Sequence, residues 1–124
     1  MLAEAARSVR ASAPGLPWLR WFRSCEPLPT VRRLRQPVLI LQGALDRQVT
    51  AGQADTLAAA LRAAGNRRVT LEVFPRLNHL FLPSSSDGSP AEYPSLTDPR
   101  IPAAVLDRLA GWLASTLRAT PARP

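Results

Sequence analysis

Two side chains in this chain of 124 residues have the types and order needed to hold and move a proton. Asp46 comes a few residues after an apolar run that ends at Gly43, and His79 is the single histidine of the sequence. A carboxylate that binds an imidazole fixes its tautomer and stabilises the imidazolium, so that the ring can take a proton from a nucleophile. An imidazole suits this work because its ordinary pKa lies near neutral pH. We therefore predict that Asp46 and His79 form a catalytic acid–base pair.

The element before Asp46 predicts where its carboxylate lies. Residues 38–41, VLIL, form a continuous apolar run that is bounded by Pro37 and Gly43. Such short unbroken runs are typical of parallel strands that are covered by helices on both faces. In open α/β sheets, catalytic groups lie just beyond the carboxyl ends of the strands. Asp46 is expected at that edge.

A helix and a second strand are predicted between Asp46 and His79. Thr50 and Gln53 have the spacing of a capping box, in which the Thr50 hydroxyl accepts a hydrogen bond from the Gln53 amide. Apolar residues at helical spacing follow, and residues 69–74 then alternate as in a strand with one wetter face. Because parallel strands need a crossover helix, both chemical side chains are expected after successive parallel strands.

The C-terminal part of the sequence predicts a long loop and a helix. Residues 82–100 are rich in proline, serine, glycine and acidic side chains, which is typical of a functional lid or a flexible excursion. Pro102 stands where a first-turn proline is tolerated, and the broad apolar stripe over residues 105–117 predicts an amphipathic helix. The tail at 121–124 is expected to be flexible.

The composition argues against several classes of protein. The formal net charge is +7, and all 16 basic residues are arginine, but these are scattered and accompany no glycine–aromatic RNA motif. We therefore expect no nucleic-acid partner. One cysteine, Cys25, forms no metal-binding CxxC pattern, so no metal is expected. No apolar run approaches the ~20 residues of a membrane span. The N-terminus lacks a signal-peptide pattern, which leaves the localisation unknown, with the cytoplasm as the default.

The sequence resembles the α/β-hydrolases, and most closely their bacterial esterase and acyl-hydrolase branch, near the prolyl-oligopeptidase-like and dienelactone-hydrolase-like groups. The resemblance covers roughly residues 18–118. It is carried by PVLILQGALDRQV (37–49), RLNHLF (76–81), GSPAEY (88–93) and VLDRLAGWL (105–113). It implies an α/β fold in which residues 1–120 are the C-terminal portion of one hydrolase domain, with two parallel strands, flanking helices and an incomplete sheet.

The resemblance also implies an activity, namely hydrolysis of a small carboxylic ester or related acyl compound without a cofactor. The catalytic residues of this fold follow the order Ser, Asp, His, and Asp46 and His79 match the last two. The serine should lie in G-x-S-x-G, which this chain does not contain. We therefore expect the chain alone to be inactive and its partner to be the missing N-terminal half of the same domain.

Two alternatives to the esterase remain open from the sequence. The nearest enzymatic one is a fragment of a prolyl-oligopeptidase-like serine peptidase, and the other is a truncated remnant without catalytic function. Asn78, beside the histidine, either orients the histidine loop or only makes a local turn.

Overall fold

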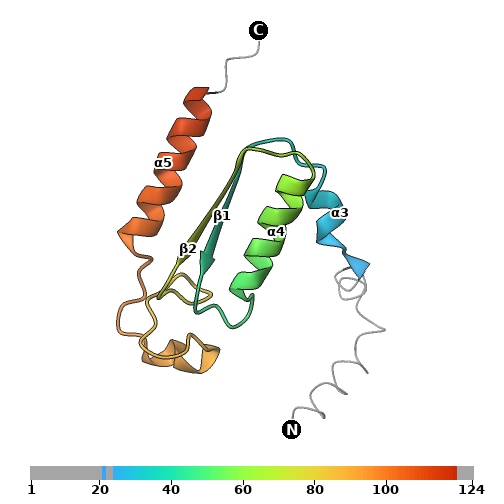
Figure 1. Ribbon diagram of the computed structural model, residues 1–124. Coiled ribbons are helices and arrows are strands. Elements are labelled where there is room, and N and C mark those ends of the chain that lie inside the picture. The colour runs from blue at the N-terminus through green and yellow to red at the C-terminus, as the bar shows by residue number, and fades with distance from the viewer. Residues whose placement is uncertain (1–20, 22–23, 120–124) are drawn as a thin grey trace. The chain divides into compact units, whose positions relative to one another are not determined.

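The computed structural model describes residue 21 and residues 24–119 (Figure 1). The predicted flexible tail at 121–124 lies outside these residues, as does the whole of residues 1–20. Contacts divide the chain into two compact units, Met1–Thr30 and Val31–Pro124. The short helix α3, Pro27–Val31, spans their boundary.

The second unit is built on two parallel strands and the helix that connects them. Strand β1, Val38–Gly43, pairs with strand β2, Val69–Phe74, in a register that aligns their first and their last residues. Helix α4, Ala51–Ala63, forms the crossover between them. The predicted strand, helix, strand order is therefore confirmed.

Helix α4 packs on the sheet through small side chains. Its buried residues are mostly alanine, which allows the helix backbone to come close to the strands; they are Ala54, Ala58, Ala60 and Leu61. The predicted capping bond is wrong. The Thr50 side chain makes no cap hydrogen bond, and the Gln53 amide instead donates to the Thr50 carbonyl oxygen at 2.9 Å. The first turn closes through the backbone, so the hydroxyl is not needed there.

The helix end is tied to the start of β1. Gly65 has a φ of 89°, the left-handed conformation that favours glycine after a helix. Asn66 follows and is buried, and its Nδ2 donates to the carbonyl oxygens of Leu34 at 3.1 Å and Gln36 at 2.9 Å. These bonds fix the chain as it enters β1.

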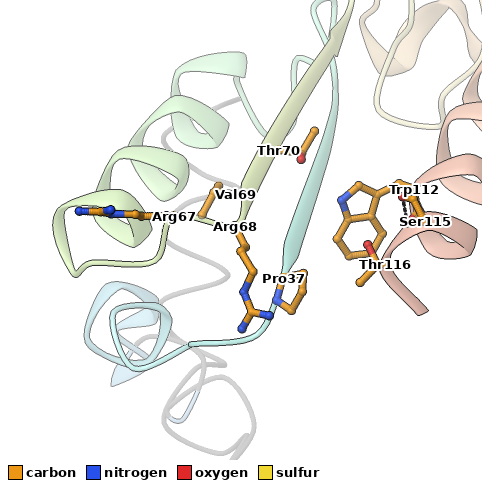
Figure 2. Close-up of a pocket in the computed structure, with 8 residues that line it drawn as sticks. All are labelled: Pro37, Arg67, Arg68, Val69, Thr70, Trp112, Ser115 and Thr116. Atoms are coloured by element: carbon orange, nitrogen blue, oxygen red, sulfur yellow. Dashed lines mark hydrogen bonds between the residues drawn. The ribbon is translucent and has the colours of Figure 1, made fainter. Parts of the chain in front are cut away.

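The sheet is less covered than the sequence predicts. Residues 38–41 are only half-buried, and the fully buried part of β1 is its end, Gln42 and Gly43. Helix α4 and helix α5, Ala103–Ala119, lie on opposite sides of the strands (Figures 1 and 2). In the part of the chain that the structure describes, β1 has only β2 as a neighbour. With one neighbouring strand in this part of the chain, the apolar residues of β1 stay partly exposed.

Strand β2 also departs from the predicted alternation. Val73, expected on an apolar face, is 40% exposed. The Glu72 side chain is also 40% exposed, and its Oε2 accepts a hydrogen bond from Arg108 Nε of α5 at 2.9 Å. The Glu72–Arg108 ion pair therefore links β2 to α5 at the partly exposed surface of the sheet.

The segment between β2 and α5 contains more structure than expected. The 3-10 helix η2, Pro90–Ser95, lies within the predicted loop at 82–100. Helix α5 confirms the predicted C-terminal helix. No helix among the described residues is long and apolar enough to cross a membrane.

Candidate active site

The structure brings Asp46 and His79 together. Each follows the carboxyl end of one of the two parallel strands, Asp46 after β1 and His79 after β2. The Asp46 Oδ2 and His79 Nδ1 atoms are 2.9 Å apart. The strand order therefore places a carboxylate and an imidazole at hydrogen-bonding distance, as parallel neighbours predict.

A glycine at the end of β1 allows this approach. A Cβ atom on Gly43 would lie 2.4 Å from the Leu77 carbonyl oxygen and 2.7 Å from that of Asn78. Leu45, two residues further, donates its amide to the Leu77 oxygen at 3.0 Å. Because both oxygens belong to the backbone that leads to His79, only glycine lets the strand end touch the histidine loop.

The Asp46 carboxylate is buried but well bonded. Asp46 is 8% exposed, and its Oδ1 accepts hydrogen bonds from the backbone amides of Gln48 and Val49, each at 2.8 Å. Burial raises the pKa of Asp46. Four hydrogen bonds together outweigh this effect of burial and hold the pKa of Asp46 below its ordinary value; their donors are Val49, His79, Gln48 and Gln42. Asp46 is therefore ionised at neutral pH.

His79 presents one ring nitrogen to Asp46 and leaves the other accessible. Its side chain is 37% exposed, and among the described residues Nε2 has no hydrogen-bond partner. An ionised carboxylate can only accept, so the proton between the two side chains belongs to Nδ1. Nε2 then carries a lone pair and can act as a general base.

Asn78 orders the loop that carries His79. It is completely buried, and its Oδ1 accepts the backbone amides of Leu80 at 2.9 Å and Leu82 at 3.1 Å. The backbone amide of Asn78 donates to the Leu82 carbonyl oxygen at 3.0 Å. The loop is tight enough that Phe81 takes a φ of 56°. Asn78 therefore does both things that the sequence suggested as alternatives, since the local turn that it makes is the loop that carries His79.

Sequence reasoning missed Gln42. Its buried Nε2 lies 3.2 Å from Asp46 Oδ2, 3.0 Å from the Gly43 oxygen and 3.0 Å from the Val49 oxygen. One amide thus joins the strand end, the carboxylate and the start of the next segment. A polar residue at the end of an otherwise apolar strand is the signal that would have indicated it.

A cavity of about 330 Å³ lies at the other end of the strands (Figure 2). It adjoins the first residues of β2, whereas Asp46 and His79 follow the strand ends. Figure 2 shows Trp112 of α5 facing it, with Pro37 and Arg68 on the sheet side. Its lining is Pro37, Arg67, Arg68, Val69, Thr70, Trp112, Ser115 and Thr116. It is not part of the Asp46–His79 site.

The described part of the chain holds no group of three or more acidic, histidine or cysteine side chains placed to bind a metal. None of its serine, threonine or cysteine side chains makes a hydrogen bond with the His79 ring. The site as described is a carboxylate–imidazole pair with one free nitrogen.

Parallel strands joined by a helix, with a hydrogen-bonded aspartate and histidine beyond their ends, define an α/β protein. Residues 18–98 match the model of the prolyl oligopeptidase family, so the chain belongs to that family of the α/β-hydrolase superfamily. The assignment as a hydrolase rests on this match.

The chain is also similar to the esterase EstD from Thermotoga maritima, with 30% identity over 92 residues. The aligned part is 74% of this chain and 21% of the esterase, so the chain spans about a fifth of the length of that relative. No solved structure matches the chain significantly.

Proposed function

We propose that this chain is the C-terminal portion of a serine hydrolase that cleaves carboxylic esters or related acyl compounds, and that it supplies the acid–base pair. The observation that carries this is the 2.9 Å contact between Asp46 and His79 with a free Nε2. Family membership supports the hydrolase class, and the esterase relative supports an ester substrate.

The proposed mechanism uses a serine from outside this chain, since no G-x-S-x-G is present in its sequence. His79 Nε2 takes the serine hydroxyl proton as the serine oxygen attacks the substrate carbonyl carbon. The imidazolium, which Asp46 stabilises, then returns this proton to the departing alcohol as the carbon–oxygen bond breaks. In the second half, water attacks the acyl-enzyme with the same assistance, releasing the carboxylic acid and the serine.

Two alternatives share this site. The family name favours a peptidase, in which the leaving group is an amine and not an alcohol. A remnant without a nucleophile would keep the pair and have no activity. Assays with an ester and with a peptide substrate separate the esterase, the peptidase and the inactive remnant.

The test uses the whole protein that contains this chain, assayed with a p-nitrophenyl ester and with a peptide p-nitroanilide. We expect ester hydrolysis, and we expect His79→Ala to lower kcat by about 10³-fold or more because the base is lost. Asp46→Asn should lower kcat by less than His79→Ala does, but still by well over tenfold. Asp55→Asn, an exposed aspartate of α4, is the matched control and should leave kcat unchanged.

Two results would contradict the proposal. Ester turnover that survives His79→Ala would remove the pair from the chemistry. Turnover by the purified 124-residue chain, lost in His79→Ala, would show that no outside serine is needed. Faster cleavage of the peptide than of the ester would favour the peptidase.

A further inference from the structure

The segment at residues 84–95, here termed the brace, contacts the loop that carries Asp46. Arg47 Nε donates to the Asp87 carbonyl oxygen at 2.9 Å, and Gln48 Nε2 donates to the Tyr93 hydroxyl at 3.0 Å. Both donors lie directly after the catalytic carboxylate in the sequence. The brace is thus bonded to the aspartate loop at two points.

A glycine brings the brace against this loop. Gly88 is buried and has a φ of 76°, and a Cβ atom there would lie 1.9 Å from the Leu45 carbonyl oxygen. The backbone of the brace therefore rests on the residue before Asp46 without an intervening side chain. The segment that the sequence predicts as a lid or flexible excursion is in close contact with the site.

The same segment contacts the histidine loop from its other end. The Ser84 amide donates to the Arg76 oxygen at 2.9 Å, and Leu77 pairs with Pro83 in an antiparallel bridge. The brace therefore begins as a continuation of the loop that holds His79, and ends at the aspartate loop.

Within the brace, Glu92 faces Asn78 of the histidine loop. Glu92 Oε2 accepts a hydrogen bond from the Ser86 hydroxyl. Its other oxygen, Oε1, is buried and has no partner, and the only other such side-chain atom in the described part of the chain is Asn78 Nδ2. One is an acceptor and one a donor. The Asn78 side chain is also among the groups that act on the Glu92 carboxyl, so the two unpaired atoms lie near each other. Buried polar atoms are nearly always paired.

The charge state of Glu92 is consistent with this proximity. The hydroxyls of Ser86 and Ser84, and with them the Asn78 amide, hold the pKa of the Glu92 carboxyl below its ordinary value, against the opposing effect of burial. The carboxylate is therefore ionised at neutral pH, and hydrogen bonds to an ionised acceptor are the stronger kind.

We propose that Glu92 is a positioning residue for His79, which it holds by accepting a hydrogen bond from the Asn78 side-chain amide. A small side-chain rotation pairs the two atoms. Asn78 Oδ1 already accepts hydrogen bonds from the Leu80 and Leu82 backbone amides on either side of the turn. A hydrogen bond from the Asn78 side-chain amide to Glu92 therefore holds the whole side chain, and with it the loop, in place. This inference rests on the proposed function, in which the His79 imidazole must stay hydrogen-bonded to Asp46.

The first test compares Glu92→Leu with Glu92→Gln in the whole protein. Leucine removes both acceptors, and we expect kcat to fall about 10- to 100-fold with KM nearly unchanged, because the imidazole shifts while no substrate contact is lost. Glutamine keeps an acceptor of the same shape and should recover kcat to within about threefold. Asp98→Leu is the matched control, since Asp98 is an exposed acid three residues after the brace and its side chain bonds to Arg100.

An exchange of donor and acceptor provides a second test that does not depend on how Glu92→Leu folds. Asn78→Asp keeps the Oδ1 acceptor but turns the donor into a carboxylate opposite Glu92, so kcat should fall through repulsion. Adding Glu92→Gln supplies a donor again, and the double variant should regain most of the lost kcat. A double variant no better than Asn78→Asp would overturn the proposal.

The two proposals fail in different ways. If His79→Ala leaves ester turnover intact, the proposed function fails. If His79→Ala abolishes turnover but Glu92→Leu and the exchange pair both behave like the Asp98→Leu control, only the role of Glu92 fails.

Discussion

At the scale of single residues, the site depends on how a buried carboxylate is kept charged. Four donors surround Asp46, two from the backbone and two from the side chains of Gln42 and His79. This set outweighs the cost of burial and lowers the pKa of Asp46. The same contacts that orient the imidazole therefore also keep its partner ionised.

A pH dependence of stability follows from the lowered pKa of Asp46. A carboxyl group whose pKa is depressed on folding stabilises the folded state above its unfolded pKa of ~3.9, and this contribution is lost as pH falls through the folded value. Gln42→Leu removes one donor, which narrows this pKa difference, so we expect a loss of about 1–3 kcal/mol at neutral pH that shrinks toward acid pH.

The measurement is denaturant unfolding of the whole protein between pH 3 and 7. Gln53→Leu, at an exposed glutamine of α4, is the control and should change stability little at any pH. A Gln42→Leu effect of the same size at all pH values would mean that Gln42 acts only through packing or through the two carbonyl oxygens.

At the scale of elements, the closeness of β1 to the histidine loop is set by Gly43. Gly43→Ala places a methyl group against two carbonyl oxygens that cannot rotate away. We expect a loss of about 1–3 kcal/mol of stability from overpacking, together with reduced kcat as the histidine loop is pushed from Asp46. Thermal unfolding and steady-state kinetics of the whole protein measure the two effects.

Gly52→Ala is the matched substitution, because its added Cβ has no neighbour within 4 Å and the residue lies in α4. It should be neutral or stabilising by up to about 1 kcal/mol. If both alanine variants behave alike, the close approach at Gly43 has no energetic consequence.

The elements and the closeness of Asp46 to His79 were predictable from the sequence because they depend on local patterns. The apolar run before Gly43 and the order of Asp46 and His79 indicated the strands and the pair. The contacts of Gln42 and the proposed role of Glu92 were not, since each depends on which atoms lie opposite the side chain after folding. The predicted Thr50 capping bond was wrong for a related reason. The spacing of Thr50 and Gln53 does not decide whether the Gln53 amide donates to the Thr50 hydroxyl or to the Thr50 carbonyl oxygen.

At the scale of the whole molecule, the described unit leaves much apolar surface uncovered. Helix α5 exposes four leucines, Leu106, Leu109, Leu113 and Leu117. The β1 residues expected in a core are half-buried. Exposed apolar faces of this extent mark surfaces that are made for a partner, here the remainder of the hydrolase sheet by our proposal.

We therefore expect the purified 124-residue chain to aggregate, or to bind the upstream half of its domain when the two are expressed together. Light scattering with size-exclusion chromatography measures this, and Leu109→Lys with Leu113→Lys should raise the monomeric fraction because charge replaces apolar surface. A soluble monomer of the unsubstituted chain with one sharp two-state melt would contradict the expectation.

The loops that carry Asp46 and His79, the helix between them and the brace all fall within one continuous stretch, from Val38 to Ser95. One uninterrupted segment of the gene therefore encodes both side chains and the contacts that bring them together. By our proposal, genetic recombination that joins this segment to a different upstream sequence would combine the same acid–base pair with a different nucleophile and substrate pocket.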